Sequence, residues 1–228
     1  MKTSQVALIP FFLLSHVNAF VVLDPKKTSS LVLSSKKGAD EVTMQNAFAV
    51  GTFVEFEEKG REHIGTIAKQ EHKSSGGARY QVVDNNGKSF NVPDKAVKFA
   101  IHPPNSPGQA AKLFDEFVSA HDASEESLQT SLDISPELLE IAWEESAETE
   151  DHILTPSFLV ELVHSHAASA IEKYMAWKLL RTETAHVFFK EIKDHGRVVN
   201  FKAKARKAVD AAKQAFCNSH EDSDMCLV

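Results

Sequence analysis

The pattern of apolar and polar positions changes along the chain, and residues 51–101 carry short alternating runs separated by turn residues. Such runs are typical of strands that bury one face. Asn86-Gly87 predicts a tight hairpin turn, because both residues tolerate positive φ, and Gly65 predicts a β-bulge. Short strands at this density, with one helical turn before the last, predict a small SH3-like barrel. The strands are expected at 52–56, 63–68, 79–84, 89–92 and 97–101, and the helical turn at 93–96.

From residue 106 onward the apolar residues recur at the three- and four-residue spacing of helices. Ser106, Ser135 and Thr155 each precede a proline. That pair is expected where a helix begins, because the first side chain can cap the helix and the proline fits its first turn. Helices are therefore predicted to begin at 107, 136 and 156, and a longer helix is predicted over 168–180.

A β-hairpin is predicted after these helices, with strands at 186–192 and 197–201 and a turn at 194–196. Helices followed by a hairpin form the order of a winged helix, a helix-turn-helix variant whose wing is the hairpin. A last helix over 203–216 carries Lys and Arg on one face and apolar residues on the other.

The predicted fold class is therefore α+β: a small SH3-like β-barrel, an acidic helical linker, and a winged-helix domain with a C-terminal basic helix. Shifts in composition place the boundaries between these parts. The expected segments are a signal peptide at 1–19, a transit-peptide-like disordered segment at 20–47, the barrel at 48–104, the linker at 105–134, the winged-helix domain with its last helix at 135–216, and a disordered tail at 217–228.

The N-terminus has the composition of a targeting sequence. Lys2, an apolar run at 6–14 and the small-residue site ending at Ala19 predict a secretory signal peptide. Phe20 follows, and residues 20–39 are rich in Ser and Lys with one acidic residue, as in organelle transit peptides. Together these parts resemble the two-part plastid presequence of algae with complex plastids, in which Phe follows the cleavage site. The resemblance implies the plastid (chloroplast) stroma, without stable membrane association after processing; the alternative is simple secretion.

The formal net charge is −7, and the charged residues are unevenly distributed along the chain. Residues 105–160 carry one Lys against thirteen carboxylates, whereas residues 161–218 carry eleven cations against six carboxylates. The overall negative charge disfavours coating of nucleic acid by bulk charge, but the basic C-terminal third could follow a phosphate backbone. The alternative is that these cations only keep the surface soluble. The candidate RNA contacts are Lys173, Lys178, Arg181, Lys190, Lys193, Arg197, Lys202, Lys204, Arg206 and Lys207.

No residue pattern predicts a metal site, a cofactor or a catalytic group. The carboxylates of the acidic segment fall on polar faces and in loops, where a solvated surface explains them better than acid–base chemistry. The two cysteines lie close together near the C-terminus and give no disulfide framework for a core. Three patterns were weighed as metal sites and rejected on ligand spacing: His164 with His166, Cys217 with His220 and Cys226, and the turn at 84–87.

The order of these parts resembles the N-terminal region of the ribonuclease II/R exoribonucleases, in the form found in cyanobacteria and plastids. The resemblance covers about residues 50–216 and rests on segments 51–56, 83–87, 138–144, 154–156, 174–180 and 186–190. Those enzymes hydrolyse RNA from its 3′ end with Asp residues that hold Mg²⁺ in a separate catalytic domain. No residue here matches that cluster, so the resemblance implies the accessory, RNA-contacting part alone, and a truncated gene product is one explanation.

The expected function is therefore an RNA-binding accessory module without enzymatic activity, which binds single-stranded RNA weakly and in a salt-dependent way. The alternative is a protein–protein docking module of a plastid RNA-processing complex, because fold alone does not fix function and the acidic segment could recruit a basic partner. A DNA-binding regulator ranks below both. Its third helix would bring Glu172 to the DNA backbone and offers no bidentate base-reading residue at its start.

Overall fold

The computed structural model describes residues 47–72, 77–149 and 151–220, together with Cys226. The predicted signal peptide and almost all of the transit-like segment lie outside the described residues. All described residues fall within one compact unit. Among the described helices, none combines the length and the apolar character needed to cross a membrane.

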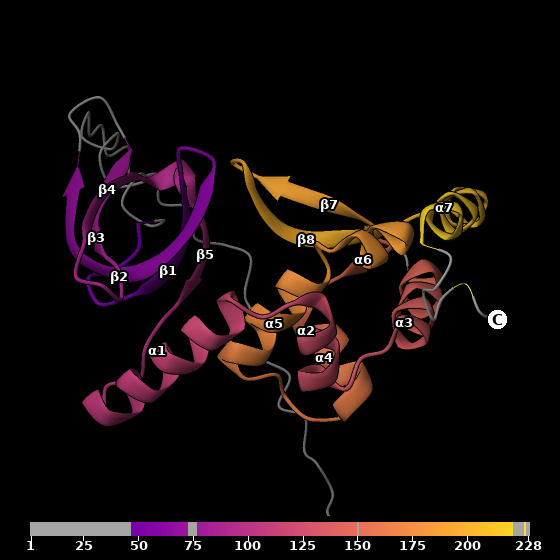
Figure 1. Cartoon of the computed structure of the whole chain (residues 1–228), viewed down its shortest axis with the longest axis horizontal. Helices are drawn as coiled ribbons and strands as arrows, with labels where there is room; N and C mark the ends of the chain where they lie inside the picture. The colour runs from indigo at the N-terminus through magenta and orange to yellow at the C-terminus, as the bar shows by residue number, and fades with distance from the viewer. Residues whose placement is uncertain (1–46, 73–76, 150, 221–225, 227–228) are drawn as a thin grey trace, which may run out of the picture. The chain divides into compact units, whose positions relative to one another are not determined.

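The first half of the described chain forms an antiparallel sheet in the order β4-β3-β2-β1-β5, which curls on itself (Figure 1). Its inner face buries an apolar cluster that includes Val54, Phe56 and Tyr80. The predicted strands and the helical turn before the last strand are confirmed, and the first two strands are longer than expected. The bounds are Phe53–Glu58 for β1, Arg61–His72 for β2, Ala78–Val83 for β3, Ser89–Pro93 for β4, Asp94–Ala96 for the 3-10 turn η2, and Val97–Ile101 for β5.

The two glycine predictions in this sheet had different outcomes. The hairpin is confirmed, and the Gly87 N–H donates to the Asp84 carbonyl at 3.1 Å; of the predicted pair Asn86-Gly87, Gly87 alone has a positive φ, of +77°. The bulge at Gly65 is wrong, because the register between β2 and β3 shifts between Ile67 and Lys69 instead. Gly65 is needed for a close approach: a Cβ there would lie 2.5 Å from the Val83 carbonyl oxygen.

Helices make up most of the second half, and the three predicted serine- or threonine-proline starts are confirmed. The side chains of Ser135 and Thr155 accept hydrogen bonds from the N–H groups of Leu138 and Phe158, as helix caps do. Ser106 precedes its helix without such a bond. The helices are α1 Pro107–His121, α2 Glu125–Leu132, α3 Pro136–Glu148, α4 Pro156–His164, α5 Ala170–Leu179, α6 Glu183–Phe188 and α7 Arg206–Ser219.

A second, three-stranded sheet forms the wing, in the order β6-β8-β7 (Figure 1). Its strands are β6 Ile153–Leu154, β7 Phe189–Asp194 and β8 Arg197–Ala203. The predicted hairpin turn is confirmed, with positive φ at His195 and Gly196. Together with α3, α4 and α5 this sheet forms the predicted winged helix, so the α+β fold class is confirmed.

Three local predictions in this half are wrong or incomplete. Residues 186–188 belong to α6 rather than to the first wing strand, because the Thr182 hydroxyl caps a helix there by accepting from the Ala185 N–H. The short helix α2 and the short strand β6 were not predicted. The last helix begins and ends three residues later than predicted.

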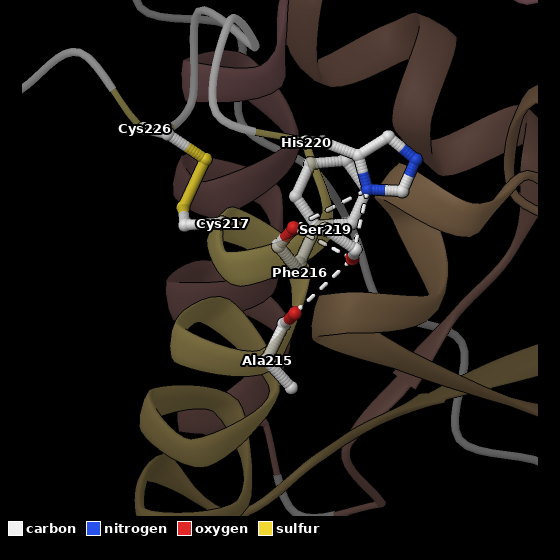
Figure 2. Close-up of a disulfide and its surroundings, with 6 residues drawn as sticks. All are labelled: Ala215, Phe216, Cys217, Ser219, His220 and Cys226. Atoms are coloured by element: carbon white, nitrogen blue, oxygen red, sulfur yellow. Dashed lines mark hydrogen bonds between the residues drawn. A yellow bond between two sulfur atoms is a disulfide. The ribbon is translucent and has the colours of Figure 1, made fainter.

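The end of α7 also corrects the prediction of a disordered tail at 217–228. Residues 217–219 continue the helix, and Cys217 is joined to Cys226 by a disulfide (Figure 2). Beside it, the ring of His220 stacks on Phe216 with centroids 4.4 Å apart, and the Ser219 hydroxyl donates to the Phe216 carbonyl at 3.0 Å (Figure 2). The disulfide joins the last turn of α7 to Cys226, and neither cysteine belongs to the apolar core.

The largest apolar cluster joins the barrel to the helices. Phe53 and Ile101 on the outside of the barrel pack into one cluster with Phe117 of α1 and with Tyr174 and Trp177 of α5. Phe117, Tyr174 and Trp177 are at most 1% exposed. The segment that the sequence indicated as a linker, 105–134, therefore contributes core residues through α1 and α2.

Candidate nucleic-acid interface

The outer face of the wing sheet carries a row of unpaired lysines. In the register of this sheet Lys202 of β8 lies between Ile153 of β6 and Lys190 of β7. The neighbouring row, Leu154 with Phe201, points the other way and is fully buried. Because side chains alternate between the two faces of a strand, burial of the Phe201 row holds Lys190 and Lys202 in solvent.

Lys190 and Lys202 are directly opposed like charges. Directly opposed residues on antiparallel strands have Cβ atoms roughly 5 Å apart, and like charges in that arrangement destabilise a sheet. Within the described part of the chain neither ammonium group has an ion pair or a hydrogen bond with another side chain. An anion such as a phosphate, bound between them, would remove this repulsion.

Four further cations of the predicted set are also exposed. Lys173 on α5 and Lys207 on α7 are exposed and form no ion pair with a described residue. Lys193 and Arg206 pair with Glu191 at 2.9 Å and with Glu144 at 3.0 Å, while more than half of each side chain remains exposed. Exposed pairs of this kind contribute little stability and can exchange for a phosphate.

The remaining four predicted contacts serve the fold instead. Lys178 donates its ammonium to the His121 carbonyl, and Lys204 donates to the His186 carbonyl. Burial lowers the pKa of both lysines. Arg181 and Arg197 keep only 25% and 20% of their side chains exposed. The structure thus divides the predicted set of ten into six surface cations and four that hold elements together.

Arg197 ties the wing to the barrel. Its guanidinium forms an ion pair with Asp94 in η2 and donates to the carbonyl of Val97 at 3.1 Å. It also lies over the ring of Phe48, 4.9 Å from the centroid. These contacts are made by the side of the hairpin that faces the barrel, so Arg197 is not available as a free phosphate contact.

Arg181 and Glu55 form a buried polar network between the barrel and α5 that the sequence analysis missed. Glu55 is 0% exposed, accepts a hydrogen bond from the Tyr174 hydroxyl, and lies 3.7 Å from the Arg181 guanidinium. The Nδ1 atom of His121 lies 3.3 Å from Glu55 Oε2 and 3.2 Å from the Tyr174 oxygen. Arg181 also pairs with Glu62 at 3.4 Å. A signal for this network exists in the sequence, since Glu55 lies between the apolar residues Val54 and Phe56 and shares a strand face with Phe53.

The protonation equilibria reflect this burial. Burial alone would raise the pKa of Glu55, but the hydrogen bonds from His121 and Tyr174 and the nearby positive charges outweigh it, so the pKa lies below its usual range. Burial, followed by the charge of Glu55, raises the pKa of Tyr174 far above its usual value. Glu55 is therefore a buried carboxylate and Tyr174 a neutral donor to it.

The histidines that were weighed as a metal site are engaged in local structure. His164 Nε2 lies 2.6 Å from the Leu132 carbonyl, and His166 Nε2 lies 3.0 Å from Glu172. Glu172 also completes a capping box with Ser169 at the start of α5. Across the described ranges, no group of three or more His, Cys, Asp or Glu side chains is placed to hold a metal ion.

Comparison with known proteins locates one domain. Residues 125–208 match the family model described as "Ribonuclease II, winged helix domain". That span begins at α2, ten residues before the start predicted for the winged-helix domain, and ends within α7. No curated protein matched the sequence.

Among solved structures, the chain is similar to an active-site mutant of the Dss1 exoribonuclease from Candida glabrata, with 12% identity and a TM-score of 0.45. The match covers 82% of this chain and 28% of that one, and a likeness of this size carries no argument about function. The resemblance indicated by the sequence is confirmed for the domain that the family model covers: residues 125–208 are similar to the winged-helix domain of ribonuclease II.

Proposed function

We propose that this chain is an RNA-binding accessory module that holds single-stranded RNA on the outer face of its wing. The observation that carries the proposal is the opposed pair Lys190 and Lys202, exposed and without ion-pair partners among the described residues. The pair lies within the span that matches a ribonuclease II winged-helix domain. A backbone phosphate between the two ammonium groups would relieve their repulsion and be held by both.

The same surface explains the expected strength and character of binding. Lys173, Lys193, Arg206 and Lys207 add exposed charge that can contact further phosphates. Contacts to phosphates carry no sequence information, so binding is weak, largely independent of sequence, and sensitive to salt. The two tryptophans of the chain, Trp143 and Trp177, are at most 3% exposed and cannot stack on a base.

We further propose that the chain itself contributes no step of RNA hydrolysis. Several carboxylates in its structured part are engaged in ion pairs: Glu55 and Glu191 bind Arg181, and Glu140 binds Lys213. Metal-assisted cleavage of a phosphodiester needs several carboxylates that converge on one ion. The test is shortening of a 3′-labelled RNA by the full chain with Mg²⁺ or Mn²⁺. Processive, metal-dependent shortening that copurifies with the chain would contradict this proposal.

Plastid localisation is proposed from the N-terminal sequence alone, with secretion as the alternative. A fluorescent protein fused to the C-terminus of the full chain, expressed in an alga with a complex plastid, distinguishes the two. Fluorescence inside the plastid supports the proposal, and fluorescence in the secretory pathway or the medium contradicts it.

The binding proposal is tested by reversing charge on the wing. Lys190→Glu/Lys202→Glu in the full chain should weaken binding of a single-stranded oligoribonucleotide by at least about tenfold, because attraction becomes repulsion at the proposed contact. Lys69→Glu/Lys112→Glu is the matched control, since it changes net charge equally through exposed lysines on β2 and α1. Equal losses in the two variants would contradict a site on the wing. Circular dichroism establishes that both variants are folded.

A further inference from the structure

A hollow of about 800 Å³ lies where the barrel and the β7–β8 hairpin meet. Its wall includes Arg79 of β3, Lys95 of η2, His102 just after β5, and Arg197 of β8. Apart from Arg197, none of these residues belongs to the set of cations singled out in the sequence. Neither Lys190 nor Lys202 lines the hollow, so it is separate from the contact proposed on the outer face of the wing.

Arg79 lacks the partners that the other arginine in this hollow has. Arg197 is held by Asp94 and by main-chain carbonyls, whereas Arg79 makes no hydrogen bond or close ion pair with any described side chain. Its Nε atom is buried and has no hydrogen-bond partner. Glu71, its cross-strand partner, acts on it only at longer range and is paired with Lys69 at 2.9 Å. A partly buried guanidinium with an unsatisfied N–H is costly unless a ligand satisfies it.

The acidic residues of the hollow do not supply that ligand. Asp94 binds Arg197 and accepts a hydrogen bond from the Tyr80 hydroxyl at 2.8 Å. Asp194 lies 2.7 Å from the ring nitrogen Nδ1 of His195. Lys95 is exposed and forms no ion pair with the described part of the protein. The charge left over in the hollow is therefore positive and comes from Arg79 and Lys95.

We infer that this hollow binds a backbone phosphate of the RNA, with Arg79 as the fork-shaped donor and Lys95 as a second charge. The inference rests on the proposed function and adds a contact on the barrel. A guanidinium can donate two parallel N–H hydrogen bonds to two oxygens of one phosphate. A phosphate bound in this way would satisfy the buried Nε–H group of Arg79. Free nucleotides and inorganic phosphate present the same chemistry, so the test compares all three sources.

The test follows Arg79 directly in the full, ¹⁵N-labelled chain. Its Nε–H resonance is identified as the signal missing from Arg79→Gln. The probes are an oligouridylate of about twelve nucleotides, within the usual site size of such modules, uridine monophosphate, and inorganic phosphate. We expect a saturable shift of this resonance at lower concentrations of the oligonucleotide than of the other two probes.

Variants supply the second measurement. Arg79→Gln/Lys95→Gln should weaken oligonucleotide binding several-fold and lower the magnitude of the slope of log affinity against log salt by about 0.7, since about 0.7 is lost per phosphate contact on single strands and the two residues share one phosphate. The matched control Arg61→Gln/Lys112→Gln removes one Arg and one Lys that do not line the hollow and should change affinity by less than about twofold.

The outcomes separate this inference from the proposed function. If the oligonucleotide binds but the Arg79 resonance does not move, the hollow is not a contact and the inference is overturned while the wing site stands. If phosphate or the mononucleotide moves the resonance and the oligonucleotide does not, the hollow is a small-anion site and the RNA assignment is overturned. If the oligonucleotide does not bind the chain at all, both proposals fail.

Discussion

Removal of the Tyr174 hydroxyl tests whether the buried network joins the barrel to the helices. Tyr174 and Glu55 are both 0% exposed, and the hydroxyl donates to the carboxylate. Tyr174→Phe keeps the ring that packs against Phe99 and Phe117, with centroids 5.1 and 4.5 Å away. The substitution therefore removes one donor from a buried carboxylate and leaves the aromatic packing in place.

The expected cost follows from the charge of the acceptor. A hydrogen bond to a charged group contributes about 1.5–3 kcal/mol, so Tyr174→Phe should lower the free energy of unfolding by about 2 kcal/mol. Glu55→Gln leaves Arg181 without its buried counterion and should cost about 3 kcal/mol. The double variant should lose less than the sum, with a coupling energy of about 1 kcal/mol, because Glu55→Gln already replaces the charged acceptor of the Tyr174 hydroxyl by a neutral one.

Urea unfolding of the full chain, followed by tryptophan fluorescence, measures these values for the wild type, the two single variants and the double variant. Trp177 reports on the network because Arg181 lies over its ring, 4.3 Å from the centroid. Tyr80→Phe is the control, since Tyr80 belongs to the other apolar cluster and its hydroxyl donates to Asp94. This substitution should show no coupling to Glu55→Gln. A coupling below about 0.5 kcal/mol between Tyr174 and Glu55 would refute the reasoning.

Three further predictions concern titration, the disulfide and packing. Burial raises the pKa of Tyr80 to about 12 from 10.0 and raises the pKa of Tyr174 further, so the native chain should show no tyrosinate absorbance near pH 10. Because the folded state holds these protons more tightly than the unfolded state, the free energy of unfolding should be unaffected below pH 10 and should fall as pH rises from 10 towards 12. Tyrosinate absorbance that appears with a pKa near 10 would contradict this prediction. Without reductant the chain should bind no maleimide, and after reduction mass spectrometry should show two maleimides per chain, at Cys217 and Cys226. Labelling of the untreated, folded chain would contradict the disulfide. Gly65→Ala should destabilise the barrel by at least about 2 kcal/mol in urea unfolding, because the added methyl meets a main-chain carbonyl that cannot move aside, and an unchanged midpoint would contradict that contact.

Local signals predicted those elements whose causes are local. The proline after Ser135 and after Thr155 predicted where α3 and α4 begin, and Asn86-Gly87 predicted a hairpin, because capping and positive φ depend on neighbouring residues only. Residues 186–188 were predicted as strand because Val187 and Phe188 favour strands by propensity. Burial of both side chains in the helical core outweighs that propensity.

The candidate site could be predicted only in part, because the partners of its residues are brought together by the fold and not by local sequence. Charge counting found the basic third of the chain, but it could not separate Lys190 and Lys202, which face solvent, from Arg181 and Arg197, which bind carboxylates far away in sequence. Three of the carboxylates that bind the two arginines, Glu55, Glu62 and Asp94, lie in the barrel, and only the fold brings them to the arginines. The unpaired Arg79 is likewise visible only once its surroundings are known.

The salt dependence of RNA binding tests the central claim most directly. Fluorescence anisotropy of a labelled single-stranded oligoribonucleotide, titrated with the full chain between about 50 and 200 mM salt, should give a slope of log affinity against log salt of about −2, from roughly three phosphates held by the four unpaired lysines at about 0.7 each. Lys190→Glu/Lys202→Glu should reduce the magnitude of that slope by at least about 0.7, because the phosphate that the two lysines share is lost. No binding by tens of micromolar protein at the lowest salt, or a slope that the wing variant leaves unchanged, would contradict the account.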